Sequence, residues 1–196
     1  MKTGQKKKRV VIFGGSFDPP HHGHTLGVRT VLDLFPCDEI WLMPSAKRRD
    51  KAMKSPPKHR LEMLRIMIKE TFPKTKIPIR VNRLEVKSRG FTTTFKTMTE
   101  LRKRNPEKEF YLLVGSDNLR KIMDVWVKGP RLFNQERFLV FRRPGAPLPK
   151  KLPRHCTLLE TSQTGISSTA IRNLVREGKD IASYVTAGVA EYIKRN

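Results

Sequence analysis

Residues 9–24 read RVVIFGGSFDPPHHGH, and this stretch decides the fold class. Its first five residues, Arg9 to Phe13, form a short run rich in β-branched residues, which predicts a buried strand that ends at Gly14 and Gly15. After the histidines, apolar residues recur at helical spacing until Pro36 ends the helix; they are Val28, Val31, Leu32 and Phe35. A strand, a glycine turn and a helix in this order are typical of an α/β sheet.

Strands and helices continue to alternate along the chain. Further strands are expected at 39–43, 77–86, 109–114, 137–141 and 157–160. Helices are expected at 93–104, at 167–177, at Val185 to Ile193, and from Pro56 to Phe72 with Ser55 as its N-cap. Parallel strands need long crossover connections, which these helices supply. The pattern therefore predicts an α/β fold with a doubly wound, mostly parallel sheet flanked by helices.

Two strand-to-helix junctions are the expected place for a ligand. In doubly wound sheets, ligands bind outside the carboxyl ends of the strands, near the point where the strand order reverses. The junctions at 14–24 and 115–118 both follow strongly apolar strands. We therefore look for functional residues in these two segments.

Length and composition narrow the function classes. The 196 residues suit a single domain covering 1–196, and no apolar stretch approaches the roughly 20 residues of a membrane helix. Cys37 and Cys156 are far apart and outside any CxxC motif, which favours reduced thiols and a cytoplasmic location.

The chain is strongly basic, with 41 Lys and Arg against 18 Asp and Glu and a formal charge of +23. This charge predicts a polyanionic partner, either a nucleotide or a nucleic acid. A charged surface that only keeps molecules apart in solution is the alternative for most of these residues. Nucleic-acid binding favours aromatic residues among the charges. The three basic clusters, at 2–9, 47–60 and 142–154, contain no Phe, Tyr or Trp, so nucleic acid is the less favoured partner.

The glycines and histidines of the first junction indicate a phosphate site. Gly14 and Gly15 let a ligand approach the backbone, and the N-terminus of the following helix attracts anions. His21 and His24 could donate charged hydrogen bonds to phosphate oxygens. Zinc binding is an alternative for HHGH, but a site would need further ligands, and no Cys lies close to the histidines.

Two motifs carry a resemblance to a known family. GGSFDPPHHGH at 14–24 resembles the GG[ST]FDPxHxGH signature of the nucleotidyltransferase superfamily, and in particular of bacterial nicotinate-nucleotide adenylyltransferases. ISSTAIR at 166–172 resembles the ISSTxIR motif of the same family. Weaker similarities at 59–64, 90–101, 114–126 and 184–193 extend the resemblance over nearly the whole chain.

The resemblance implies a Rossmann-like nucleotidyltransferase fold and a reaction. The family transfers the adenylyl group of ATP to the 5′-phosphate of nicotinate mononucleotide, which gives nicotinate adenine dinucleotide and pyrophosphate in NAD biosynthesis. It also implies Mg²⁺ bound through the ATP phosphates, with no dedicated metal motif in the protein. Two alternatives are a sister nucleotidyltransferase with another phosphorylated acceptor and a basic nucleic-acid-binding protein on the same fold.

The same resemblance implies which residues form the site. His21 and His24 would be catalytic. ATP would contact two sets of residues: Gly14, Gly15, Ser16, Phe17 and His24 in the first motif, and Ile166, Ser167, Ser168, Thr169 and Arg172 in the second. Gly115 and Asp117 would border the adenosine. The residues themselves leave plainer alternatives open, because Ser167 to Thr169 could be a helix N-cap, Asp117 another cap, and Arg172 an exposed helix residue.

The acceptor side departs from the family pattern. Thr94, Phe91, Trp126 and Lys51 would bind the acceptor, with the indole stacked on its pyridine ring. The usual Pro-His-Lys step is Arg49-Asp50-Lys51 here, and the usual Ser-Tyr-Thr step is Thr92-Thr93-Thr94. Both departures concern the acceptor rather than ATP. Trp126 as a core aromatic and Thr94 as an ordinary helix threonine remain alternatives.

Overall fold

The computed structural model describes residues 6–46, 53–88, 90, 92–142, 147–160 and 165–196. Six strands form one sheet in the order β3-β2-β1-β4-β5-β6, and each neighbouring pair is parallel. The strands are β1 (Lys8–Gly15), β2 (Glu39–Pro44), β3 (Ile79–Val81), β4 (Lys108–Gly115), β5 (Arg137–Phe141) and β6 (His155–Leu159). The predicted doubly wound parallel sheet is confirmed.

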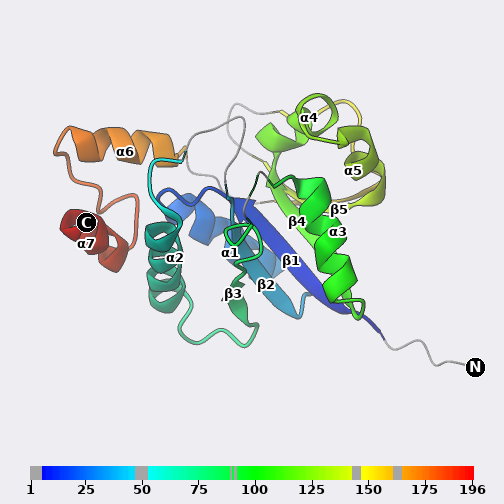
Figure 1. The fold of residues 1–196 in the computed structure, drawn as a ribbon, viewed down its shortest axis with the longest axis horizontal. Coiled ribbons are helices and arrows are strands. Elements are labelled where there is room, and N and C mark those ends of the chain that lie inside the picture. The colour runs from blue at the N-terminus through cyan, green and yellow to red at the C-terminus, as the bar shows by residue number, and fades with distance from the viewer. Residues whose placement is uncertain (1–5, 47–52, 89, 91, 143–146, 161–164) are drawn as a thin grey trace, which may run out of the picture.

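Helices cover both faces of this sheet (Figure 1). They are α1 (His22–Leu34), α2 (Pro57–Thr71), α3 (Thr94–Arg104), α4 (Ser116–Val125), α5 (Gly129–Gln135), α6 (Ser168–Arg176) and α7 (Ala187–Arg195). Alternate residues of β1 serve two cores: Val11 and Phe13 pack with α1, α2, α6 and α7, whereas Val10 and Ile12 pack with α3, α4 and α5. Period-two side-chain alternation is what lets one buried strand hold both layers together.

The strand order reverses at β1. From β1 the chain moves outward to β2 and β3, and it then returns to place β4 on the other side of β1. Phe13 pairs with Leu113 of β4, and Gly15 pairs with Pro44 of β2. The two predicted junctions, after β1 and after β4, therefore lie side by side at the carboxyl edge, where doubly wound sheets bind ligands.

The third strand is much shorter than the predicted 77–86. Strand β3 spans Ile79–Val81 at the edge of the sheet. Pro78 supplies no N–H to a ladder, and beyond the strand the Asn82 side chain accepts a hydrogen bond from the Leu84 N–H at 2.9 Å. This local bond begins a turn, because an Asn side chain competes with the sheet for backbone partners.

Two helix starts also differ from expectation. Pro56 rather than Ser55 is the N-cap of α2, and Pro57 is the first helical residue. Helix α5 was not expected at all; it follows a tight turn in which Lys128 adopts a left-handed φ of 57°. A Cβ on Gly129 would lie 1.9 Å from the Ile122 carbonyl oxygen, so glycine is required for α4 and α5 to approach this closely.

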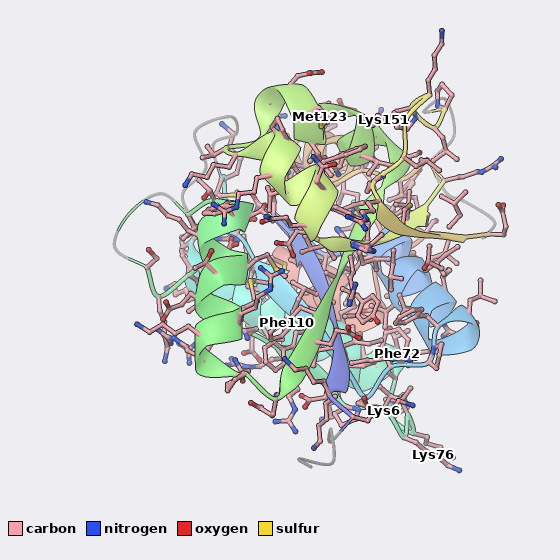
Figure 2. All side chains as sticks on the ribbon, turned by 90° about the vertical axis from the view of Figure 1, so that its right-hand side faces the viewer. Lys6, Phe72, Lys76, Phe110, Met123 and Lys151 are labelled. Atoms are coloured by element: carbon pink, nitrogen blue, oxygen red, sulfur yellow. The ribbon has the colours of Figure 1, made fainter. Side chains whose placement is uncertain are left out.

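Much of the positive charge lies on extended surface side chains. Lys6, Lys76 and Lys151 are exposed and point away from the molecule, whereas Phe110 packs in the core beside α3 (Figure 2). Within the described ranges, no helix combines the length and apolar character needed to cross a membrane.

Candidate active site

The two predicted catalytic histidines stack on each other at the start of α1. His21 is the N-cap of the helix, and its backbone N–H donates to Nδ1 of His24 at 3.1 Å. The two ring centroids are 3.8 Å apart, and the His24 ring also packs 4.7 Å from the ring of Phe17. Because Nδ1 of His24 accepts a hydrogen bond, the ring proton sits on Nε2, which makes Nε2 a donor.

The two glycines that end β1 leave backbone accessible. Gly14 is exposed, and a Cβ there would meet no atom within 4 Å. A Cβ on Gly15 would lie 3.1 Å from the ring of Phe17, which is fully buried and has a left-handed φ of 49°. Phe17 thus turns the chain sharply next to the glycines. A left-handed φ is strained for a residue other than glycine, and functional loops often contain such strained residues.

The second motif lies against the first, although they are far apart in sequence. Ser168 Oγ donates to the Pro19 carbonyl at 2.9 Å, and Arg172 Nη1 donates to the Asp18 carbonyl at 2.6 Å. Helix α6 therefore begins beside the histidine turn. The first N–H groups of a helix lack partners within the helix and carry partial positive charge, so this junction suits an anion.

The members of the Ile166–Arg172 motif have different surroundings. Ser167 caps α6 by accepting from the Ala170 N–H at 3.2 Å, which is the plainer alternative considered above. Thr169 is exposed, and its hydroxyl accepts from Arg172 Nη2 at 3.1 Å. Ile166 is partly buried against the core on the α1 side. Arg172 is thus neither isolated nor merely exposed, because its guanidinium bridges α6 and the loop before α1.

Gly115 and Asp117 lie at the neighbouring junction. Gly115 is the N-cap of α4, and Asp117 follows in the first turn of that helix. The carboxylate is therefore favourably placed at the positive end of the helix, but it is not the cap residue itself. Since β4 is adjacent to β1, both residues share the carboxyl edge with Gly14 and Gly15.

The structure describes two of the four predicted acceptor residues. Thr94 is the first residue of α3, and Trp126 is the C-cap of α4; both are partly buried on the same side of the sheet. Lys128 Nζ lies 4.4 Å above the ring of Phe95, so the chain after Trp126 reaches the start of α3. Phe91 and Lys51 lie outside the described residues.

Sequence reasoning missed two buried charged residues, Asp18 and Arg60, which are 2% and 1% exposed. Burial lowers the pKa of Arg60, and the nearby charge of Asp18 offsets part of this effect. A signal was present, because Arg60 falls on the apolar stripe of its helix beside Leu61 and Leu64. A charged residue on a buried face needs a partner.

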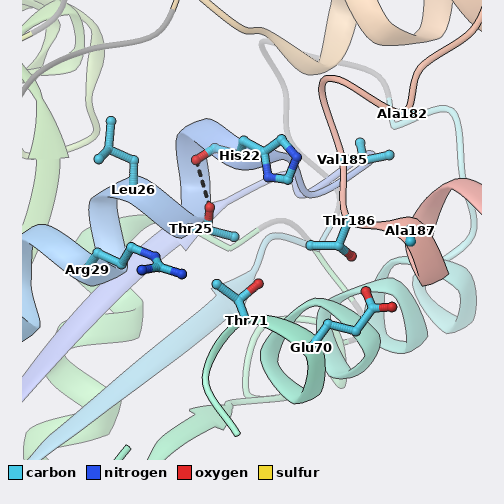
Figure 3. Close-up of a pocket in the computed structure, with 10 residues that line it drawn as sticks. All are labelled: His22, Thr25, Leu26, Arg29, Glu70, Thr71, Ala182, Val185, Thr186 and Ala187. Carbon is cyan, nitrogen blue, oxygen red and sulfur yellow. Dashed lines mark hydrogen bonds between the residues drawn. The ribbon is translucent and has the colours of Figure 1, made fainter.

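A hollow of about 880 Å³ lies elsewhere, between α1, α2 and the start of α7. His22 and Arg29 line it on one side, with Glu70 and Thr186 opposite (Figure 3). Neither His21 nor His24 lines it, so this hollow is distinct from the edge where the two motifs meet. His22 is the only histidine of HHGH that lines this hollow, and none of the predicted site residues that the structure describes lines it.

The edge is built for anion chemistry. Across the part of the chain that the structure describes, no group of three or more His, Cys, Asp or Glu side chains gathers as a metal site. The groups that do gather are imidazoles, hydroxyls, a guanidinium and helix N-termini. Such donors bind and stabilise phosphate oxygens.

Comparison with known proteins agrees with this chemistry. The pattern of the cytidylyltransferase-like family matches residues 12–174. The chain is 31% identical over 193 residues to a probable nicotinate-nucleotide adenylyltransferase of Bacillus licheniformis, covering 96% of this chain and 97% of that protein. It is 30% identical over 191 residues to the nicotinate-nucleotide adenylyltransferase of Bacillus subtilis, with the same coverage of 96% and 97%.

Solved structures show the same fold. The nicotinic acid mononucleotide adenylyltransferase of Plasmodium falciparum complexed with NaAD matches 96% of this chain and 95% of its own, with a TM-score of 0.80 and 25% identity. The same enzyme complexed with APC matches with a TM-score of 0.82 and 24% identity. In sequence over nearly its full length, and in fold, this chain belongs to the cytidylyltransferase-like nucleotidyltransferases and, among them, to the nicotinate-nucleotide adenylyltransferase family.

Proposed function

We propose that this protein transfers the adenylyl group of ATP to the 5′-phosphate of nicotinate mononucleotide. The observation that carries the proposal is the meeting of the stacked His21–His24 pair with the start of α6, through Ser168 and Arg172. This arrangement sits at the strand edge where a triphosphate would lie. Family membership supplies the reaction class, and the 196 residues would act as one nucleotidyltransferase domain.

The reaction needs positioning more than proton transfer. An oxygen of the acceptor 5′-phosphate attacks the α-phosphorus of ATP in line, and the bond from that phosphorus to the bridging oxygen of the β-phosphate breaks. Pyrophosphate carries away the electron pair. The attacking phosphate is already an anion, so no general base is required. Catalysis therefore comes from alignment and from donors aimed at developing negative charge.

The ATP side of the proposal assigns a contact to each predicted residue at this edge. Gly14, Gly15, Ser16 and Phe17 would offer backbone and hydroxyl contacts to the phosphates. Nε2 of His24, with its proton directed by the His21 bond, would donate to an α-phosphate oxygen, and His21 would donate beside it. The start of α6 would bind the β- and γ-phosphates through Ser167, Ser168, Thr169 and Arg172, and Ile166 just before it would also contact ATP.

Mg²⁺ would enter with the nucleotide. It favours oxygen ligands, keeps several waters and commonly takes substrate phosphates as ligands. The imidazoles, hydroxyls and guanidinium at this edge fit phosphates rather than the metal itself. The cation would neutralise charge on the triphosphate, while the protein holds the phosphate oxygens.

The acceptor side is the finer part of the proposal. Trp126 would stack on the pyridine ring, and Thr94 at the start of α3 would bind the carboxylate. Phe91 and Lys51 would complete this side, and Gly115 and Asp117 would border the adenosine. The departures at 49–51 and 92–94 make the acceptor the first property to measure.

The test is a pyrophosphate-release assay with ATP, Mg²⁺ and a panel of acceptors. Nicotinate mononucleotide, nicotinamide mononucleotide and phosphopantetheine are compared, and the dinucleotide product is identified by mass spectrometry. The highest kcat/KM should belong to nicotinate mononucleotide. A preference for another acceptor would correct the substrate, and no turnover with any member would reject the reaction.

A further inference from the structure

The loop that carries the first motif is held from both sides by arginines. Arg60 of α2 donates from Nη1 to the Ser16 carbonyl at 2.8 Å, and Arg172 of α6 donates to the Asp18 carbonyl. These bonds fix backbone oxygens, not side chains. They therefore hold the backbone of residues 16–18, which connects the glycines to the histidines, in one position.

Asp18 ties this loop to a second segment. Its Oδ2 accepts from the Lys54 N–H at 2.8 Å, and its Oδ1 accepts from the Ser55 N–H at 3.2 Å. Arg60 makes the reciprocal connection, because its Nε donates to the Ser55 carbonyl at 3.3 Å. The pair thus joins residues 16–18 to residues 54 and 55, which lead into α2.

Stability alone does not explain why Asp18 and Arg60 are buried, because burying charged side chains costs free energy. Both side chains are almost fully buried. Removing two charges from water costs several kcal/mol per ion, and well-packed apolar residues of similar volume are often as stable or more so. What two buried charged side chains provide instead is directional bonding to several fixed atoms. Here those atoms all belong to the two segments that approach the carboxyl edge.

We propose that Asp18 and Arg60 are positioning residues for adenylyl transfer, which hold the phosphate loop and the chain at 54–55 at the separation that the reaction requires. This inference rests on the proposed function. The pair touches no reacting atom, and it acts through the backbone of residues 16–18. A displacement of about 1 Å at such a loop can cost about a hundredfold in rate.

Asp18→Asn is the first variant. The amide keeps one oxygen that can accept from a backbone N–H but loses the charge and the second acceptor. We expect kcat to fall about tenfold or more while KM for ATP stays within about threefold, because alignment is lost rather than binding. Asp38→Asn is the matched control, since its carboxylate also accepts a backbone N–H, that of Arg9 at 2.7 Å, at the opposite end of β1.

Arg60→Lys is the second variant. Lysine keeps the positive charge beside Asp18, but its compact ammonium lacks the planar fork that reaches both Ser16 and Ser55. We expect kcat to fall about fivefold or more, consistent with lost geometry rather than lost charge. Arg65→Lys on the same helix is the control, because Arg65 is exposed and pairs with Glu62.

Thermal unfolding of each variant separates positioning from stability. A kcat within twofold of wild type in folded Asp18→Asn and Arg60→Lys would overturn the proposal, and so would equal losses in the controls. Failure of both variants to fold would also reject it in favour of a structural role. An inactive wild type in the same assay would instead reject the proposed function, so the two failures are distinguishable.

Discussion

The backbone N–H of His21 donates to Nδ1 of His24 across the first turn of α1. This bond fixes the ring of His24 with Nε2 as its donor, and the stacked ring of His21 limits rotation further. The helix start thus does two things at once: it satisfies one of its own open N–H groups and orients an imidazole. The first prediction follows from this relationship.

His24→Ala should lower kcat about a hundredfold while the protein stays folded, which is the scale for losing one transition-state donor. His24→Gln should retain more activity, because its amide N–H₂ can reach the position of Nε2. The measurement is steady-state kinetics with thermal unfolding of each variant. His22→Ala serves as control, since His22 lines the separate hollow. Unchanged kcat in His24→Ala would contradict the role given to this ring.

Trp126→Ala should raise KM for the acceptor about tenfold and leave KM for ATP unchanged, because base–aromatic stacking contributes about 1–3 kcal/mol. Trp126→Phe keeps an aromatic ring, so its KM for the acceptor should lie between those of the wild type and Trp126→Ala. Competition binding of the mononucleotide checks the same point without turnover. Equal effects on both substrates would mean that Trp126 supports the fold rather than the acceptor.

The sequence predicted the parts of this protein that depend on local pattern. The strand before Gly14 and the helix after His21 follow from apolar periodicity, and the position of the site follows from the parallel topology. Asp18 and Arg60 were missed because their roles depend on which atoms of distant segments face them. Helix α5 was missed because seven residues give little periodic signal, and its start depends on a turn at Lys128 and Gly129.

Strand β3 shows the opposite error. Alternation over 77–86 suggested a long strand, but the Asn82 side chain accepts a hydrogen bond from the Leu84 N–H, and the strand ends after three residues. Alternation of apolar and polar residues indicates which side chains are buried, but it does not indicate where the hydrogen bonds between strands stop. Local pattern also misplaced the N-cap of α2 at Ser55. The backbone of Ser55 instead forms hydrogen bonds with the side chains of Asp18 and Arg60.

Glu39 should make stability depend on acidic pH. Burial by itself raises the pKa of Glu39, but hydrogen bonds from Trp41 and Lys108 and the charges of Lys108 and Arg80 outweigh burial, so the net pKa is lowered. A lowered folded pKa stabilises the protein above the unfolded value of about 4.3, and this contribution disappears as pH falls through the folded pKa.

Glu39→Gln should therefore be less stable than wild type near neutral pH, and the difference should shrink as the solution is acidified below about pH 4.3. Urea unfolding at a series of pH values measures this. Glu62→Gln is the comparison, because Glu62 is solvent-exposed and such pairs contribute little. A difference that stays constant down to the acid limit would show that packing, not charge, explains the loss.

The cysteines should react slowly with thiol reagents in the folded protein. Burial, with a smaller contribution from Asp38, raises the pKa of Cys37 to about 11, and burial also raises the pKa of Cys156. The reactive thiolate is therefore scarce at neutral pH. Iodoacetamide labelling followed by mass spectrometry should give much slower modification than for glutathione, and full modification in urea. Labelling of either native cysteine at the glutathione rate would contradict these environments.

The bond from Arg172 to the carbonyl of Asp18 spans 154 positions of the chain. Most of these residues must still be synthesised after the first motif is complete before Arg172 can reach the Asp18 carbonyl. The proposed triphosphate site is therefore completed only once nearly the whole chain has been made.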